Sequence, residues 1–417
     1  MVKRIGIVGS GDAGTLTANL LAAKLGTQLK QERVSIELFG RDEAHVFQPG
    51  NLDVAFKGAS PEKFVKEEST LLKPSIKFIA EPVTGISLED REITLSRGQK
   101  RTFDYLILAT GSESFPEGIE GLSSEALFFH KGPFDSRKIW SALQNFQGGN
   151  VVIAITGVPH KCPPSPNEAA FLVDEYLRKR GIRDKSNIKF LTPYPRAYPS
   201  AELAKTVQEE FDKKGIEVST FFNVDYVDPK NKTISSLEGD KFSYDLLFAV
   251  PPHRGAKVIR DSEIGSDKDG WIPTDKGRLN VKNYDDLYSI GDATDIPTSK
   301  SGVVAHLESV LLSKNLVGEV IGSGEEPEVY NGRINCPMEM GGRKAIFVSA
   351  TYSQPPKYQS PSFVKYEMKR AFGRLYWSAM KGSWEWLFRL YFGKTSSKLK
   401  SEEILTNPPE IEPLITK

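Results

Sequence analysis

The start of the chain constrains its fold more than any other stretch. An apolar run typical of a buried strand, residues 3–8, leads directly into Gly9-Ser10-Gly11-Asp12-Ala13-Gly14. A strand, the pattern GxGxxG and a following helix, expected here over residues 15–25, are typical of a dinucleotide-binding loop. The first glycine allows a tight turn, the second admits the pyrophosphate and the third lets the helix pack on the strand, while the helix N-terminus offers N–H donors. The sequence therefore predicts a dinucleotide site at this loop.

The second predicted strand, residues 34–39, departs from the usual pattern at its end. In dinucleotide-binding domains this strand is followed by an acidic residue that binds the ribose hydroxyls. Here Gly40 takes that place, and Arg41 and Asp42 follow. Two interpretations stay open: Asp42 replaces the usual acidic residue, or the ribose is held in another way.

Two later strands end in residues suited to a cofactor. Residues 103–111 form an apolar strand that stops at Thr110 and Gly111, and residues 283–292 deliver Gly291 and Asp292. The carboxyl ends of parallel strands line the ligand crevice, so Asp292 is placed to accept hydrogen bonds from cofactor hydroxyls. Asp292 can also cap a helix, a role compatible with the first, and a helix is expected over residues 301–320.

A second strand, loop and helix begin at residue 151. The β-branched run 151–155 predicts a buried parallel strand, and residues 167–180 predict a helix. The loop between them contains Gly157, His160, Cys162 and several prolines instead of a glycine pattern. Prolines have no N–H group that could bind a phosphate, and they stiffen the loop. We therefore predict a nucleotide-binding scaffold that presents the Cys162 thiol in place of a second nucleotide.

Internal symmetry predicts the domain organisation. Residues 244–253 repeat the pattern of residues 103–111, an aromatic residue and an aspartate before a buried strand. This repeat predicts an α/β fold of two nested Rossmann-like domains. We place the first domain at residues 1–115 and 246–330, the second, which contains Cys162, at 116–245, and a C-terminal region, which contains Cys336, at 331–417.

Composition excludes several classes of function. A net charge of +1 argues against a nucleic-acid partner, and the five histidines have no spacing that predicts a metal site. The only two cysteines, Cys162 and Cys336, lie too far apart in the sequence for a CxxC pair. Each precedes a proline, which favours a functional thiol over an inert, buried structural one. The chain enters a strand without a leader, so we expect no export and a location on the cytoplasmic face.

The stretch 363–392 changes to an aromatic and basic composition. We expect two short amphipathic helices, broken at Gly382, that lie in a membrane interface with their aromatic rings buried and their cations at the headgroups. The alternative is a helix pair that docks on the protein's own core or on a second copy of the chain. The sequence leaves the oligomeric state open.

Several of these motifs resemble those of known flavoproteins. Gly9-x-Gly11-x-x-Gly14, Ala109-Thr110-Gly111 and Ile290-Gly291-Asp292 are similar to the three FAD motifs of proteins with two dinucleotide-binding domains. Within that superfamily, residues 160–166 around Cys162, residues 300–302, and residues 330–337 around Cys336 resemble the sulfide:quinone oxidoreductases. The chain lacks the third, earlier cysteine that many members carry, so we expect non-covalent FAD.

The resemblance implies a mechanism. Cys162 and Cys336 would form a redox pair close to the isoalloxazine, sulfide would be oxidised to sulfur or polysulfide, and a membrane quinone would bind on the opposite flavin face. Cys336 would be the cysteine nearer the flavin. For the quinone, Lys300 and Phe347 are candidates by position only. Because a reactive thiol needs a lowered pKa, we expect a nearby cation such as Lys161 to assist.

Three other functions compete with this one. A type II NADH:quinone oxidoreductase shares the FAD motifs and the stretch His45-Val-Phe-Gln-Pro49, but it needs a glycine loop for NADH and no cysteine pair. A flavoprotein sulfide dehydrogenase subunit would pass its electrons to cytochrome c. A non-catalytic FAD-binding partner protein would not need two placed cysteines.

Overall fold

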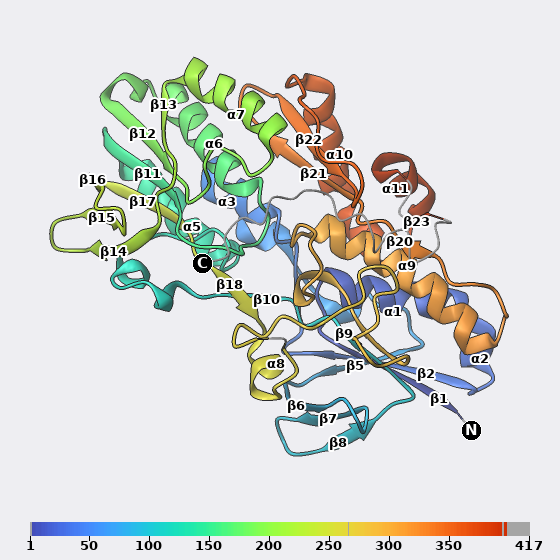
Figure 1. Cartoon of the computed structure of the whole chain (residues 1–417). Coiled ribbons are helices and arrows are strands. Elements are labelled where there is room, and N and C mark those ends of the chain that lie inside the picture. Colours follow the sequence, from blue (N-terminus) through green and yellow to red (C-terminus); the bar gives the residue numbers. More distant parts are fainter. Residues whose placement is uncertain (1, 266, 394–395, 398–417) are drawn as a thin grey trace.

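The N-terminal strand lies in the centre of a five-stranded parallel sheet. The computed structural model describes residues 2–265, 267–393 and 396–397 (Figure 1). The strand order is β19-β9-β1-β2-β5, with bounds β1 (Lys3–Val8), β2 (Val34–Gly40), β5 (Ile76–Ala80), β9 (Tyr105–Leu108) and β19 (Leu287–Ser289). All of β9 and most of β1 and β2 are buried, which explains their continuous apolar runs.

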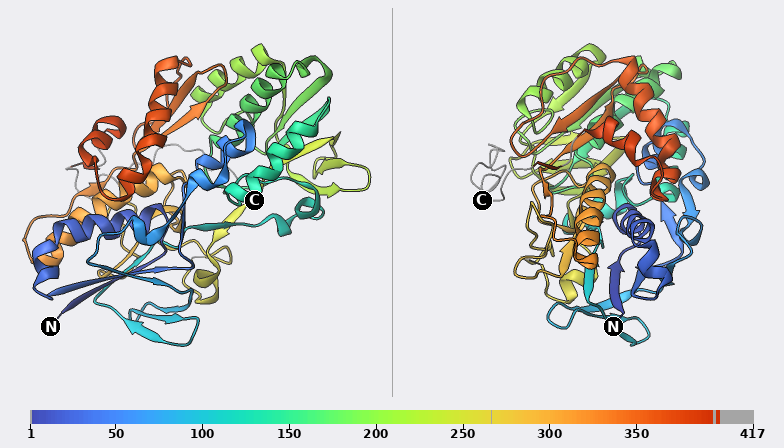
Figure 2. Two further views of the ribbon diagram at one scale, coloured as in Figure 1. Left: turned by 180° about the vertical axis from the view of Figure 1, so that it is seen from behind. Right: turned by 90° about the vertical axis from the view of Figure 1, so that its right-hand side faces the viewer.

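Two helices lie side by side on one face of this sheet. They are α1 (Asp12–Lys24), followed by the short α2 (Gly26–Lys30), and α9 (Gly302–Ile321) (Figures 1 and 2). The Ser309 hydroxyl of α9 donates to the backbone carbonyl of Ala13 at 3.0 Å, so the two helices meet beside the first glycine loop. The predicted ranges 15–25 and 301–320 match these helices to within a turn.

The other face of this sheet is bordered by a small antiparallel meander. It consists of β6 (Val83–Ser87), β7 (Glu92–Leu95) and β8 (Lys100–Thr102). The alternating, turn-punctuated pattern of residues 76–95 predicts a meander that begins at residue 76. Residues 76–80 instead form β5, which pairs in parallel with β2, because the alternating pattern of a short edge strand resembles that of a hairpin strand.

A second parallel sheet carries the Cys162 loop. Its order is β13-β12-β11-β17, with bounds β11 (Gly149–Ile155), β12 (Ser186–Leu191), β13 (Ile216–Ser219) and β17 (Leu246–Val250). Around it lie the helices α4 (Leu122–Glu125), α5 (Pro133–Asn145), α6 (Ser165–Lys179) and α7 (Ala201–Lys214), and a meander of β14 (Val224–Asp228), β15 (Thr233–Ser236) and β16 (Lys241–Ser243). Because β17 pairs with β11, the domain boundary predicted at residue 246 cuts into this sheet.

The chain passes between the two sheets on two adjacent strands. β10 (Ser112–Ser114) and β18 (His253–Gly255) pair antiparallel, with Ser112 opposite Gly255 (Figure 1). After β18 the chain forms α8 (Lys257–Asp261) and returns to the first sheet at β19. This nesting brings the carboxyl ends of both sheets towards one pocket.

A C-terminal hairpin carries the second cysteine. β21 (Ile334–Glu339) pairs with β22 (Ala345–Ala350), and Cys336 lies opposite Val348. A proline directly after Cys336 is typical of a loop, but Cys336 lies within β21, where Pro337 is tolerated because β21 pairs with a strand on one side only. The shorter strands β20 (Val329–Tyr330) and β23 (Ser396–Ser397) pair beside it.

Two helices close the described part of the chain. They are α10 (Phe363–Met380), which the Ser362 hydroxyl caps by accepting a hydrogen bond from Lys365 N, and α11 (Glu385–Phe392). Their inner face docks on the core, since Tyr376, Met380 and Phe392 are buried. Their outer surface exposes the apolar side chains of Phe363, Val364, Trp384, Trp386 and Leu390.

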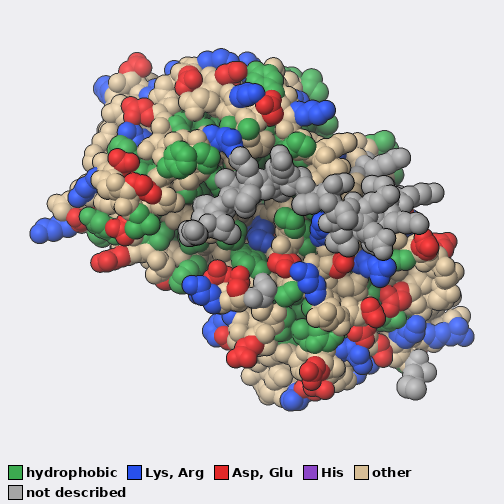
Figure 3. Space-filling view, viewed as in Figure 1, with side chains coloured by type: hydrophobic (Ala, Val, Ile, Leu, Met, Phe, Trp, Pro, Cys, Tyr) green, Lys and Arg blue, Asp and Glu red, His purple; other side chains and the backbone are tan. Residues whose placement is uncertain are grey.

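The distribution of charged side chains on the surface is consistent with the net charge of +1. On the face shown in Figure 3, acidic and basic side chains are intermixed. Within the described ranges, no helix is both long enough and apolar enough to cross a membrane. The Ser- and Lys-rich end of the predicted C-terminal region lies, apart from Ser396 and Ser397, outside the described residues.

Candidate active site

The first glycine loop is tightly packed on its inner side and open on its outer side. Gly9 has φ +111°, and a Cβ there would overlap with the backbone of Ala109, while a Cβ at Gly14 would overlap with the carbonyl of Gly9. At Gly11, by contrast, a Cβ would meet nothing within 4 Å. Gly11 is also the N-cap of α1 and supplies no side-chain cap, so the first-turn amides are available to an anion.

The side chain of Asp42 makes local contacts. Its carboxylate is exposed and accepts hydrogen bonds from the backbone N of Ala44 at 2.9 Å and from Arg41 Nε at 3.3 Å. The absence of a side chain at Gly40 leaves space for the hydroxyl of Ser10, which a Cβ would overlap. Of the two interpretations of this region, the geometry therefore favours the one in which the ribose is held without Asp42.

The other two strand ends meet the glycine loop at one cavity of about 460 Å³. Gly111, at φ +68°, and Gly291, at φ +72°, both line it, and a Cβ at Gly291 would crowd Ala13. Asp292 also lines the cavity, and burial raises the pKa of its carboxyl. The buried hydroxyl of Thr110 has no hydrogen-bond partner among the described residues. A cavity bordered by glycines and a helix N-terminus fits a dinucleotide cofactor, and Thr110 lies between two residues that line it, Ala109 and Gly111.

The second loop is closed to a nucleotide. The Cys162 backbone N donates to the Lys300 carbonyl at 2.7 Å, and Ser165 N donates to the Cys162 carbonyl at 2.8 Å. The other residues at the start of α6 include Pro163, Pro164 and Pro166, which have no N–H. Several of the amides that could hold a phosphate at the start of α6 are thus absent or already bonded. The prediction that this scaffold presents a thiol instead agrees with Cys162 at the cavity.

Cys336 lines the same cavity as Cys162. Its sulfur lies 3.3 Å from the Ser301 hydroxyl and 3.5 Å from the Ser299 hydroxyl. The segment 299–301 therefore contacts both cysteines, because its Lys300 carbonyl binds the Cys162 backbone and its serines face the Cys336 sulfur. Cysteines 174 positions apart by number are brought to one pocket by this segment.

Neither thiol is activated on balance, although the charge of Lys369 acts to lower the pKa of Cys162. Burial raises the pKa of both Cys162 and Cys336, and the charge of Glu168 raises both further. Lys161, which we expected to assist Cys162, lies 3.8 Å from the Asp292 carboxylate and donates to the Gln48 side chain. The expectation of a lowered thiol pKa is therefore wrong for this state, because burial outweighs any nearby positive charge.

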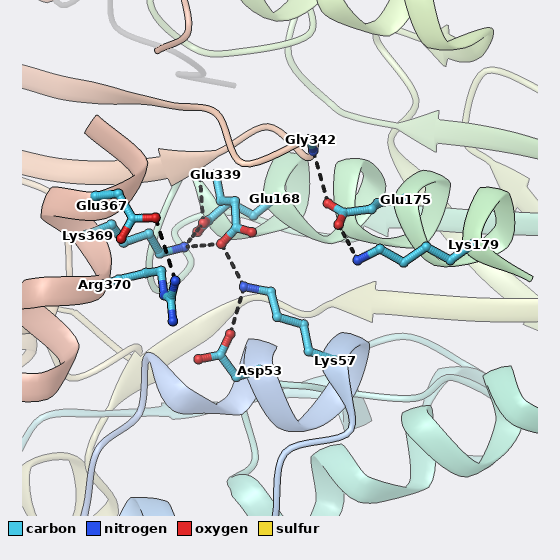
Figure 4. Close-up of polar contacts among 10 residues, drawn as sticks. All are labelled: Asp53, Lys57, Glu168, Glu175, Lys179, Glu339, Gly342, Glu367, Lys369 and Arg370. Atoms are coloured by element: carbon cyan, nitrogen blue, oxygen red, sulfur yellow. Dashed lines mark hydrogen bonds and ion pairs between the residues drawn. The ribbon is translucent and has the colours of Figure 1, made fainter. Parts of the chain in front are cut away.

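A ladder of alternating charges borders the cavity beside the cysteines (Figure 4). The Lys369 ammonium of α10 contacts the carboxylates of Glu168 on α6 and Glu339 on β21. Glu339 also binds Lys57 at 2.8 Å, and Lys57 binds Asp53 at 2.9 Å, both on α3 (Gly50–Lys57). The ladder runs from the buried Glu168 to the half-exposed Asp53, and none of its members was predicted.

The two quinone candidates lie in different places. Lys300 lines the cavity, donates to the Thr294 carbonyl at 2.7 Å and lies 4.0 Å from the Trp271 ring centre. Burial lowers the pKa of Lys300. Phe347 is on β22, its ring contacts Tyr391, and it is not among the residues that line the cavity. Phe372 and Tyr376 of α10 line the cavity instead.

Two further cavity residues were missed because their sequence signal was weak. His130, which has no motif around it in the sequence, lines the cavity, and its Nε2 lies 2.9 Å from the Ser165 hydroxyl. Phe372 belongs to the aromatic stretch that we had assigned to a membrane interface. When one face of a helix docks on the core, an aromatic stretch can line a cavity with that face and expose aromatic side chains on the other.

Family models match both halves of the nested fold. The description of the first is pyridine nucleotide-disulphide oxidoreductase, and it matches residues 3–157. The N-terminal part of the chain thus matches this superfamily. FAD is accordingly the cofactor of this protein, as predicted, and the protein is an oxidoreductase. The second model, which matches residues 138–251, describes the central part of the flavoprotein chain of sulfide dehydrogenase (flavocytochrome c).

Several known proteins are similar to this chain over most of its length. This flavoprotein is 27% identical to the mitochondrial sulfide:quinone oxidoreductase of Dictyostelium discoideum, over 97% of this chain and 90% of that protein. It is 26% identical to the corresponding protein of Mus musculus, over 91% and 86%. The solved sulfide:quinone oxidoreductase of Aquifex aeolicus superposes with a TM-score of 0.82 at 20% identity, covering 95% of this chain and 96% of that one. The predicted resemblance is confirmed.

Proposed function

We propose that this flavoprotein is a sulfide:quinone oxidoreductase that oxidises sulfide to sulfur or polysulfide and reduces a membrane quinone. The observation that carries the proposal is the presence of Cys162 and Cys336 at one cavity with the glycine loop and the Gly291-Asp292 turn. The similarity to sulfide:quinone oxidoreductases over most of the chain supports it. Gly9 to Gly14, Thr110, Gly111, Gly291 and Asp292 would hold FAD without a covalent bond.

The cysteines would perform the sulfur chemistry. Hydrosulfide attacks a disulfide between Cys162 and Cys336: a bond forms between the substrate sulfur and one cysteine, the bond between the cysteines breaks, and the other cysteine leaves as a thiolate. When bound, FAD supplies a two-electron acceptor that passes the electron pair on to the quinone. The oxidised sulfur is released or extended to a polysulfide as the disulfide re-forms.

The surroundings of the sulfurs suggest which cysteine takes which role. The Ser299 and Ser301 hydroxyls can donate to a thiolate on Cys336 and so stabilise its charge. Glu168 lines the same cavity, and burial raises the pKa of its carboxyl, which makes this side chain a better proton acceptor than an exposed carboxylate. We therefore assign the leaving thiolate to Cys336, the persulfide to Cys162 and proton transfer to Glu168.

The C-terminal helices would bring the enzyme to its quinone. Phe372 and Gly373 of α10 line the cavity, while the outer surface of α10 and α11 exposes Trp384, Trp386 and Leu390. Aromatic side chains with basic neighbours favour a membrane interface. We propose peripheral attachment through this exposed surface, with the quinone entering beside α10.

Two other functions are distinguished by their electron donor or acceptor. An NADH:quinone oxidoreductase needs phosphate-binding amides in the second loop, and several of those amides are absent at prolines or bonded here. The match of residues 138–251 to a flavocytochrome c sulfide dehydrogenase favours a cytochrome acceptor as the second candidate. Both candidates can be tested in one series of assays.

The test is steady-state reduction of a soluble quinone by sulfide. The wild-type enzyme should reduce the quinone with sulfide, and not with NADH, and should do so faster than it reduces cytochrome c. Cys162→Ser and Cys336→Ser should each lower kcat by more than about 10³-fold while the FAD content stays constant, because either substitution removes the disulfide. NADH-dependent reduction, or full activity without either thiol, would reject the proposal.

A further inference from the structure

A closed cluster of polar side chains lies beneath the first glycine loop. It joins Asp12 and Thr15 of α1, His45 of β3 (Ala44–Val46), Glu68 beside β4 (Val65–Glu67), and Tyr376 of α10. His45, Thr15 and Glu68 have no exposed surface, and Tyr376 is 2% exposed. The sulfide chemistry proposed above uses none of these side chains. Such a buried cluster is costly unless every member is satisfied, so its role needs an explanation.

The hydrogen bonds of the cluster form one chain with a fixed direction. Thr15 donates to Glu68 at 2.7 Å, His45 Nδ1 lies 2.8 Å from the other Glu68 oxygen, and His45 Nε2 lies 2.7 Å from the Tyr376 hydroxyl. The Tyr376 hydroxyl donates in turn to Asp12. Tyrosine has one proton, so it can donate to Asp12 only if His45 Nε2 donates to it. The complete series of hydrogen bonds, from Thr15 to Asp12, therefore requires His45 to carry protons on both ring nitrogens.

The cluster fastens the C-terminal helix to the cofactor loop. Asp12 occupies a position within the glycine pattern. Both Asp12 and Tyr376 line the cavity. A second tie lies one turn further along both helices, where the Asn19 side chain of α1 donates to the Met380 carbonyl of α10 at 2.8 Å. The ring of Phe47 packs on Tyr376, with 4.1 Å between the centroids. Helix α10 is thus held on α1, the helix whose N-terminus faces the cofactor phosphates.

We propose that Tyr376 and His45 are positioning residues that couple FAD retention to the docking of α10 on α1. Tyr376 holds the Asp12 side chain, and with it the N-terminal turn of α1, in the conformation that receives the cofactor. Docking of α10 then strengthens FAD binding, and FAD binding strengthens the docking of α10 by the same factor. This inference uses the FAD site alone and does not depend on sulfide as the substrate.

The charge of His45 gives the coupling a pH dependence. The groups that face its ring are Asp12, Thr15, Glu68, Tyr376 and Trp377, of which the first and third are carboxylates. These carboxylates outweigh burial and raise the pKa of His45 to about 9. Because this value is above the ordinary 6.5, the stabilisation is complete below pH 6.5 and is lost as the pH rises through about 9. Above that pH two uncompensated carboxylates remain beside the phosphate loop.

Release of FAD from the holoenzyme tests the proposal. Free flavin in an ultrafiltrate, measured by fluorescence, gives the dissociation constant for the wild type, for Tyr376→Phe and for the control Tyr366→Phe, whose tyrosine is also on α10 but faces Arg343 and Arg370. Tyr376→Phe should weaken FAD binding about tenfold at pH 7.5, and the control should have no effect. The wild-type dissociation constant should rise several-fold between pH 7.5 and 10, and His45→Gln should remove this rise. Equal FAD binding by the two tyrosine variants, or a flat pH profile in the wild type, would overturn the proposal.

Hydrogen exchange tests the reciprocal effect without reference to affinity. Amides of residues 372–380 should exchange at least about fivefold more slowly in the FAD-loaded full chain than in the same chain stripped of FAD, and Tyr376→Phe should abolish most of this difference. Residues 201–214 of α7, which lie on the second sheet, serve as the internal reference. Exchange of α10 that does not respond to FAD would contradict the coupling even if the affinities had changed.

Discussion

The two strand–loop–helix units of this protein share a frame and differ in what the loop leaves free. After β1, the glycines let the backbone turn closely, and the first amides of α1 have no side-chain cap. After β11, the equivalent amides are missing at prolines or bonded within the protein, and Cys162 takes the left-handed conformation at φ +49°. One loop is built to receive phosphates, and the other is built to hold a thiol.

The difference shows where specificity resides in a repeated fold. Four strands of each sheet follow the same order, β9-β1-β2-β5 and β17-β11-β12-β13, so neither this order nor the buried apolar runs distinguish a nucleotide site from a thiol site. The availability of backbone N–H groups does distinguish them. Substitutions in either loop should therefore affect one property of the enzyme and leave the other intact.

The largest effect is expected in the first loop. Gly14→Ala places a Cβ on the carbonyl of Gly9, so the loop must open, and we expect FAD affinity to fall more than about 100-fold. The measurement is the flavin-to-protein ratio after gel filtration. Gly26→Ala is the matched control, because a Cβ there meets nothing within 4 Å, and it should retain FAD. If Gly14→Ala also retained FAD, the comparison between the two loops would fail.

An intermediate effect is expected at the start of the second unit. Glu168→Gln keeps an acceptor for the Glu339 backbone N but removes the charge, and Lys369 keeps Glu339 as a partner. We expect kcat with sulfide to fall about 10²-fold, with FAD content unchanged, because the proton acceptor is lost. Glu175→Gln, on the same helix, is the control, since Glu175 contacts only Lys179 and Gly342 in Figure 4. An equal loss in both variants would show that Glu168 is structural.

The smallest effect concerns the reactivity of the thiols. Because burial raises the pKa of Cys162 and Cys336, the thiolate fraction of the reduced enzyme should be small at neutral pH and should increase with pH. Iodoacetamide should modify the reduced enzyme at least about tenfold more slowly than free cysteine at pH 7.5, and the rate should still be rising at pH 9. A rate that reaches its plateau below pH 7 would mean that the N-terminus of α6 activates the thiol after all.

Local patterns predicted the fold well. The glycine loop, the buried strands and the helices α1, α6, α7 and α9 follow from periodicity and turn residues within short windows. Errors arose where pairing partners decide the outcome. Residues 76–80 could join a hairpin or a parallel edge, and β17 could belong to either sheet, and in each case only the neighbouring strand settles it.

The candidate site was predictable only in its separate parts. The three cofactor turns and the two cysteines were found because each has a local signature. The charge ladder and the His45 cluster were not, because they depend on contacts between distant segments: His45 and Tyr376 are 331 positions apart. The thiol pKa was misjudged for a related reason, since the sequence shows a neighbouring lysine but not the burial that outweighs it.

Anaerobic reduction of the bound flavin tests the central claim most directly. With no quinone present, flavin absorbance is followed while sulfide, and in a separate sample NADH, is added to the wild type and to Cys162→Ala and Cys336→Ala. Sulfide should bleach the wild-type flavin, a soluble quinone should restore it, neither variant should be bleached by sulfide, and NADH should have no effect. If NADH bleaches the flavin and sulfide does not, the second loop binds a nucleotide and the account of the two loops is wrong.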